Sequence, residues 1–158
     1  MDIEKQHLLK EEFPLLYRIM FTREEGVPFH CIQAFGLECG NGWFDLIYDL
    51  SAKLEALIAA MPSEQQERCY AHQIKEKFGG LRVYLSTETD EMDDLISKAE
   101  DLSYKTCETC GEDGECNTEG WLITLCEKCR EEYESERAVS SIEDVFDWVD
   151  EETEEEDG

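Results

Sequence analysis

Positive charge is scarce in this chain of 158 residues, which has 14 lysines and arginines against 40 aspartates and glutamates. Its formal net charge is −26 at pH 7. Proteins bind the phosphates of nucleic acids and the anionic surfaces of membranes mainly through lysine and arginine. We therefore expect no direct binding to nucleic acid or to a membrane, and we expect a basic protein as the partner.

Hydrophobic runs of membrane-spanning length are also missing. A span needs ~20 consecutive apolar residues, and no segment of the sequence approaches that length. The first residues, MDIEKQHLLKEEF, lack the basic start and the apolar stretch of a secretory signal peptide. These observations predict a cytoplasmic protein, in which cysteines stay reduced or bind metal and do not form disulfides.

Catalytic motifs are absent as well. There is no glycine-rich phosphate loop, no nucleophile elbow and no H-E-x-x-H. Gln73-Ile74-Lys75 resembles half of a metal-dependent nuclease site, but the sequence shows no acidic partner for it on a neighbouring strand. We predict that the protein is not an enzyme, and a metal-dependent enzyme that acts on nucleic acid stays as the alternative.

What the sequence does have is a paired cysteine motif. Its members follow the pattern C-x2-C-x15-C-x2-C and are Cys107, Cys110, Cys126 and Cys129. At this spacing four thiolates bind one tetrahedral Zn²⁺. Four protein ligands leave no position for water or substrate, so we expect one zinc ion with a structural role. An iron–sulfur cluster and a redox-active dithiol are the alternatives.

The residues around these cysteines predict a small zinc finger over residues 105–138. Cys107 to Gly111 has the form of a zinc knuckle, in which glycine permits the tight turn after the second ligand. Residues 120–125 indicate a strand, and a strong helix-forming segment follows Cys126. A treble-clef or ribbon-like finger has this order of elements. Cys116 breaks the paired spacing and is interpreted as a spare thiol.

A second metal site is a further interpretation, and its candidate ligands are Cys31, Cys39, Cys69 and His72. Cys69 and His72 are spaced as a C-x2-H pair. However, both fall on a predicted strand, where positions three apart point to opposite faces. Buried cysteines and an ordinary histidine are the alternative interpretation.

Residues 1–104 predict an α+β domain, a small antiparallel sheet packed with helices. Residues 1–25 indicate a helix that is broken near Pro14, and alternation at Val27, Phe29 and Cys31 indicates a strand. An apolar stripe between Asn41 and Pro62 predicts a long helix. A capping box at residues 87–90 begins a further helix that continues to Leu102.

Residues 69–86 predict a β-hairpin that turns at Gly79-Gly80, with Phe78 paired to Leu81. In this register Ile74, Phe78, Leu81, Val83 and Leu85 share one face, and Lys75, Lys77, Arg82 and Tyr84 share the other. We interpret the three cations as a solvated strand face that balances the surrounding acid. A docking site for an anion or for the protein's own acidic tail is the alternative.

Residues 139–158 form an acidic C-terminal tail. Ile142, Val145, Phe146 and Val149 follow helical spacing, so we expect a short acidic amphipathic helix and then a disordered end. The expected partner-binding residues are Phe146, Asp147, Trp148, Asp150 and Glu151. Alternatively, the apolar stripe packs on the protein's own core and the tail only increases solubility.

Four segments carry a resemblance to a known family. FGLECGNGWFDLIYDLSAKLE, QIKEKFGGLRVYLS, CETCG and GWLITLCEKC resemble an uncharacterised family of small proteins from bacterial and phage genomes, over residues 30–130. The family's motifs appear as ECGNGW, KEKFGGLR and the two C-x-x-C pairs. The resemblance implies a bacterial or phage origin and no particular activity, and the acidic tail lies outside it.

Together these features predict a non-enzymatic, zinc-stabilised binder of a basic protein that itself binds nucleic acid. In its sharpest form this is a DNA-mimicking inhibitor of the phage anti-defence or immunity type, which acts in the cytoplasm of a bacterial or phage-infected cell. A zinc-finger adaptor that binds nucleic acid is a further alternative. Against it, residues 107–137 hold ten acidic and three basic side chains.

Overall fold

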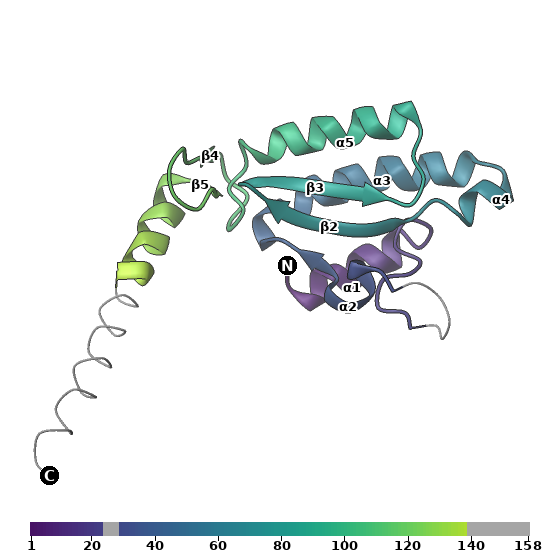
Figure 1. Cartoon of the computed structure of the whole chain (residues 1–158), viewed down its shortest axis with the longest axis horizontal. Helices are drawn as coiled ribbons and strands as arrows, with labels where there is room; N and C mark the ends of the chain where they lie inside the picture. Colours follow the sequence, from purple (N-terminus) through teal and green to yellow (C-terminus); the bar gives the residue numbers. More distant parts are fainter. Residues whose placement is uncertain (24–28, 139–158) are drawn as a thin grey trace, which may run out of the picture. The chain divides into compact units, whose positions relative to one another are not determined.

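Figure 1 shows a computed structural model of the chain, which describes residues 1–23 and 29–138. The chain divides into two compact units, Met1–Cys126 and Glu127–Gly158. The hydrophobic core lies in the first unit. In the second unit residues 127–138 are helical, as the sequence predicts for the segment after Cys126. None of the helices in these described ranges has the length and apolar character needed to cross a membrane.

Two longer helices, α3 (Phe44–Ala60) and α5 (Asp90–Ser103), form on the predicted apolar stripes. A 3-10 turn, η1 (Asn41–Trp43), leads into α3, which buries Ile47, Leu50, Leu54 and Ile58. The helix ends before Pro62, which has no backbone N–H to continue it. At the start of α5 the Thr89 side chain accepts a hydrogen bond from the Met92 N–H, which satisfies an unpaired donor of the first turn.

The shorter helices are α1 (Ile3–Glu12), α2 (Cys31–Phe35) and α4 (Ser63–Gln66). The prediction of a helix reaching residue 25 is wrong beyond Glu12, because residues 14–21 form turns. These turns still bury Leu16, Tyr17 and Met20, so the apolar spacing marks core residues without marking a helix. The strand predicted through Phe29 and Cys31 is also wrong, since Cys31 begins α2; Val27 lies outside the described residues.

The main sheet has the order β1-β2-β3, formed by β1 (Leu37–Glu38), β2 (Ala71–Lys77) and β3 (Gly80–Leu85). The α+β class and the β2–β3 hairpin are confirmed. The sheet is not purely antiparallel, however, because β1 pairs with β2 in parallel. Figure 1 shows α3 and α5 running alongside the hairpin, and α5 contacts both α3 and β3.

The hairpin turn lies one residue earlier than predicted. Lys77 pairs with Gly80, so the turn residues are Phe78 and Gly79, with φ values of 55° and 79°. Two successive residues with positive φ match the twist of a hairpin. The predicted pairing of Phe78 with Leu81 is therefore wrong, and the Phe78 side chain is exposed. The predicted faces are otherwise correct, because Ile74 pairs with Val83 and not with Leu85, a shift of two residues that keeps every side chain on its face.

A second, short sheet lies at the C-terminal end of the first unit. It pairs β4 (Glu115–Cys116) with β5 (Thr124–Leu125) in antiparallel orientation. The strand predicted over residues 120–125 is thus reduced to its last two residues. Thr124 and Leu125 are buried, and the Thr124 hydroxyl donates a hydrogen bond of 2.6 Å to the Gly79 carbonyl. This bond joins the short sheet to the hairpin turn.

Candidate metal centre

The structure brings the four cysteines of the paired motif together. The sulfurs of Cys107, Cys110, Cys126 and Cys129 all lie within 4.8 Å of one another. The sulfurs of Cys110 and Cys126 are 3.7 Å apart. Tetrahedral zinc with Zn–S bonds of about 2.3 Å would hold its sulfurs about 3.8 Å apart. Four thiols at this spacing and separation form a site suited to a metal ion.

The first cysteine pair lies in a tight backbone turn. The Gly111 N–H donates to the Cys107 carbonyl at 2.9 Å, and Gly111 has a φ of 84°. Positive φ is readily adopted by glycine, because glycine has no Cβ. The turn after the second cysteine therefore has the geometry predicted for a zinc knuckle.

Backbone donors around Cys107 favour the thiolate that a metal requires. Burial alone would raise the pKa of this thiol, because a charged sulfur is poorly solvated in the interior. Hydrogen bonds from the backbone of Cys126, Cys110 and Thr109 oppose this effect and lower the pKa from 9.0 to about 7. Thiolate is the form of cysteine that binds metal, so the local backbone supports this use of Cys107.

The four cysteines differ in exposure. Cys107 and Cys129 are buried, Cys126 is half-buried and Cys110 is exposed. A metal held by these four sulfurs would be covered by protein at Cys107 and Cys129 and open to solvent near Cys110.

The segment Gly40–Trp43 packs directly against the knuckle. The Gly42 N–H donates to the Glu108 carbonyl at 2.7 Å, and the Gly40 N–H donates to Glu108 Oε1 at 2.9 Å. The buried Trp43 donates from Nε1 to the Thr106 carbonyl at 2.8 Å. We call residues 40–43 the knuckle platform. The sequence did not predict this platform, because no local pattern relates residues 40–43 to the cysteine pairs.

Both platform glycines are required by close backbone approach. A Cβ on Gly42 would lie 2.1 Å from the Cys107 carbonyl oxygen, and one on Gly40 would lie 2.2 Å from the Glu108 carbonyl oxygen. Neither distance is compatible with a side chain. Burial also raises the pKa of the Glu108 carboxyl, and the hydrogen bond from Gly40 partly opposes that rise. Contact with the cysteine knuckle therefore explains Gly40, Gly42 and Trp43 of the ECGNGW motif.

The predicted cation group lies on one face of the hairpin, where Lys75 pairs with Arg82. Arg82 already has partners in its own domain, because it donates to the Tyr104 hydroxyl at 2.8 Å and lies 3.8 Å from a Glu100 oxygen. Lys77 places its ammonium 5.2 Å from the centre of the Phe78 ring. Docking of an anion or of the acidic tail on Lys75, Lys77 and Arg82 stays an alternative interpretation.

The predicted partner-binding residues Phe146, Asp147, Trp148, Asp150 and Glu151 lie outside the described residues. The same is true of the predicted amphipathic helix and of the acidic end that follows it. Their roles therefore stay predictions.

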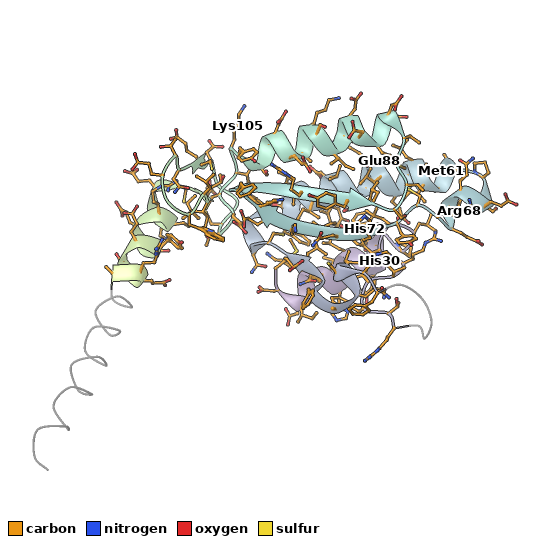
Figure 2. The ribbon with its side chains drawn as sticks, viewed as in Figure 1. His30, Met61, Arg68, His72, Glu88 and Lys105 are labelled. Atoms are coloured by element: carbon orange, nitrogen blue, oxygen red, sulfur yellow. The ribbon has the colours of Figure 1, made fainter. Side chains whose placement is uncertain are left out.

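The candidates for a second metal site remain apart. Cys31 is exposed at the start of α2, and Cys39 is buried, which raises its pKa to about 12. The Cys69 thiol donates to the Thr87 carbonyl at 3.1 Å. His72 instead lies near His30, with ring centres 5.5 Å apart (Figure 2). Within residues 1–23 and 29–138, the four-cysteine cluster is the one group of three or more metal-binding side chains.

Comparisons with family models, with curated proteins and with solved structures each gave no match. The fold and the site define a mixed α/β protein with a small sheet and a cluster of four cysteines suited to a metal ion.

Proposed function

We propose that the four-cysteine cluster holds one structural Zn²⁺. Four thiolates are a donor set that zinc prefers, and they fill every position of a tetrahedral ion. The bound ion would supply a fixed cross-link between the knuckle and the segment after β5. Binding of this kind contributes on the order of 10 kcal/mol to folding in related sites. The proposed role is stabilisation of the fold and not chemistry.

We further propose that the protein acts without catalysis by binding a basic, nucleic-acid-binding protein partner and competing with its nucleic acid. The observation that carries this proposal is the outer face of α5. Its exposed acidic side chains are Asp90, Glu91, Asp93, Asp94 and Asp101, and Lys98 is the single exposed base on the helix. This surface is predominantly acidic, and four of its five exposed acids lie within residues 90–94, at the start of the helix.

Charge supports this function in two ways. A surface of one sign steers oppositely charged partners and raises their association rate. It also repels phosphate, because phosphate binding needs lysine and arginine. A net charge of −26 extends both effects over most of the chain. A DNA-mimicking inhibitor of the anti-defence or immunity type is the form of partner binding that these charges favour.

The proposal is tested with the whole protein as bait. A bacterial lysate freed of nucleic acid supplies the partner, and duplex DNA is then titrated against the captured complex. We expect DNA to displace the partner and rising salt to slow association steeply. Simultaneous binding of DNA and this protein to the partner would contradict the proposal, as would a partner with an acidic interface.

A charge-matched pair of variants tests the role of α5. The first variant carries Asp93→Lys, Asp94→Lys and Asp101→Lys, and the control carries Glu4→Lys, Glu11→Lys and Glu64→Lys. All six side chains are exposed, and both variants change the net charge equally. The α5 variant should slow association by about tenfold or more, and the control should slow it much less. Equal effects would mean that net charge matters and that the α5 face does not.

A further inference from the structure

A cleft of about 500 Å³ lies between the hairpin turn and the loop that precedes β5. The residues that line it are Glu76, Lys77, Phe78, Gly120, Trp121 and Leu122. This volume is in the range of sites that hold a small ligand or a side chain of a partner. The cleft lies within the first unit and does not include the four cysteines.

Phe78 contributes an aromatic ring that folding does not explain. Its side chain is 65% exposed, so it adds little to the core. Its φ of 55° also lies in the left-handed region, where a bulky side chain is strained and where asparagine or glycine is favoured. The hairpin turn accounts for the positive φ but not for a bulky aromatic residue in that position, and strained residues cluster at functional sites. Strain and exposure at the same residue point to binding.

Trp121 contributes a second exposed ring from a loop that is well fixed. Its side chain is 69% exposed. Asn117 closes the loop, because its amide nitrogen donates to the Glu119 and Trp121 carbonyls at 2.6 and 2.9 Å. Its amide oxygen accepts from the Ile123 N–H at 2.7 Å. Side chains on a fixed loop lose little freedom on binding, which favours affinity.

The segments that form the two sides of the cleft are joined by contacts of neighbouring residues. The Thr124 hydroxyl donates to the Gly79 carbonyl at 2.6 Å. A Cβ on Gly79 would lie 2.5 Å from the Cys116 sulfur, so the turn and β4 are in direct contact. The aromatic rings of Phe78 and Trp121 are thus carried on segments whose separation is set by the fold.

The aromatic rings of the cleft and the net charge of the chain favour a cationic occupant, since the two charged side chains of the lining, Glu76 and Lys77, balance each other. The ammonium of Lys77 already lies 5.2 Å from the centre of the Phe78 ring, which shows that this ring accepts a cation on its face. Glu76 adds a carboxylate, and its Oε1 accepts from the Gly79 N–H at 2.7 Å. Exposed aromatic rings also stack on nucleic acid bases, but a phosphate chain would meet a protein of net charge −26.

We propose that this cleft binds an arginine or lysine side chain of the partner between Phe78 and Trp121. The proposal rests on the proposed function, because it names the anchor by which a basic partner is held. In the complex the partner's cation takes the place of Lys77 over the Phe78 ring. The acidic face of α5 then accelerates association, and the aromatic cleft slows dissociation.

The test uses a fluorescently labelled nona-arginine peptide and the full chain. Peptide affinity is measured at low and at physiological salt for the wild type, Phe78→Asn and Trp121→Ala. We expect each variant to bind about tenfold more weakly, because cation–π contacts of desolvated cations are of this strength. Phe35→Ala is the matched control, since Phe35 is 66% exposed and does not line the cleft. Its affinity should equal that of the wild type.

Thermal unfolding and zinc content verify that the variants fold. Phe78→Asn should keep or raise the melting temperature, because asparagine adopts the turn conformation with less strain. A loss of affinity with no loss of stability would separate binding from folding. Lys77→Glu should change the affinity in the opposite direction. It removes the competing cation and should raise the affinity for the peptide severalfold.

Three results would overturn the proposal, and they differ in what they leave standing. If the wild type binds the peptide in a salt-dependent manner and both cleft variants bind it equally well, the cleft is wrong and the proposed function stands. If the wild type does not bind the peptide at low salt, both proposals fail. If a labelled oligo-dT binds instead, and Phe78→Asn, Trp121→Ala and Lys77→Glu each weaken it, the cleft is a nucleic acid site.

Discussion

The cysteines of this protein form two groups with opposite environments. Cys107, Cys110, Cys126 and Cys129 converge within 4.8 Å, and backbone N–H groups lower the pKa of Cys107. Cys39 and Cys69 are each buried without such a cluster, and burial raises the pKa of both thiols. Buried cysteines occur in both groups, and the cluster also includes the exposed Cys110, so burial does not decide whether a cysteine is suited to metal. Convergence and backbone donors decide it.

Replacing a cluster cysteine should have the largest effect. We expect Cys107→Ser or Cys126→Ser to abolish binding of about one zinc per chain and to lower the free energy of unfolding by several kcal/mol. For a chain of this size each kcal/mol shifts the melting temperature by about 2–4 °C, so the fall should exceed about 10 °C. Metal analysis and thermal unfolding measure both effects. Cys31→Ser, at an exposed position, is the control.

If a cluster variant unfolds at the wild-type temperature, the four converging cysteines do not stabilise the fold more than the isolated cysteines do. Folded protein that contains iron or no metal would contradict the proposal that the bound metal is zinc.

Substitution in the knuckle platform should have the next largest effect. Gly42→Ala places a Cβ 2.1 Å from the Cys107 carbonyl oxygen, so the knuckle must move. We expect a loss of about 3 kcal/mol, in the range of severe core substitutions, together with weaker zinc binding. Gly120→Ala is the matched control, because nothing lies within 4 Å of the added Cβ. Its φ of 72° should cost only about 1 kcal/mol.

Chemical denaturation with a competing zinc chelator measures both quantities. Equal losses for the two glycine variants would show that the metal centre does not depend on the platform.

A smaller effect is expected at alkaline pH, where the buried thiol of Cys39 should make the free energy of unfolding depend on pH. Burial raises the pKa of Cys39 from 9.0 to about 12, so the folded state holds this proton more tightly than the unfolded state. The resulting stability is fully present below pH 9 and is lost as pH rises towards 12. Between pH 9 and 10 the loss should be about 1 kcal/mol.

Cys39→Ala should flatten this pH dependence, whereas Cys31→Ala should leave it unchanged. The comparison requires unfolding curves at closely spaced pH values. An unchanged slope in Cys39→Ala would mean that the buried thiol ionises as readily in the folded protein as in the unfolded chain.

The smallest effect is expected at Cys116, which lies between the two cysteine pairs in the sequence. Its thiol is half-buried and contacts the Asn117 carbonyl at 3.5 Å. Cys116→Ser should leave the zinc content unchanged and change stability by less than about 1 kcal/mol. A fall in zinc content would show that Cys116 is a metal ligand and belongs with the cluster cysteines.

The sequence predicted those features that depend on local spacing. Two C-x2-C pairs predicted the cluster, because ligand spacing is a local property of a knuckle and of a helix start. Alternation along the hairpin predicted which side chains share a face, and the apolar stripes of α3 and α5 predicted their buried sides.

Features that depend on distant contacts were not predictable in the same way. The turn was placed at Gly79-Gly80 because glycine favours positive φ, whereas the chain places Phe78 in that conformation and uses Gly80 to make room for Tyr104, whose ring would lie 2.3 Å from an added Cβ. The platform was not predicted, because its role depends on the close contact between Gly42 and the Cys107 carbonyl, which exists only in the folded chain. No local pattern records a contact between residues so far apart.

The distance between the platform and the knuckle along the chain also has a consequence for protein synthesis. Gly40 and Glu108 are 68 residues apart, yet they share a hydrogen bond. A ribosome adds about 5–20 residues per second, so the platform emerges about 3–14 s before the knuckle that covers it. During that time the backbone groups of Gly40 and Gly42 have no knuckle to pair with. The proposed metal can bind only afterwards, because its cysteine ligands are synthesised later. Binding of the proposed metal is thus expected to be a late step in the synthesis of each molecule.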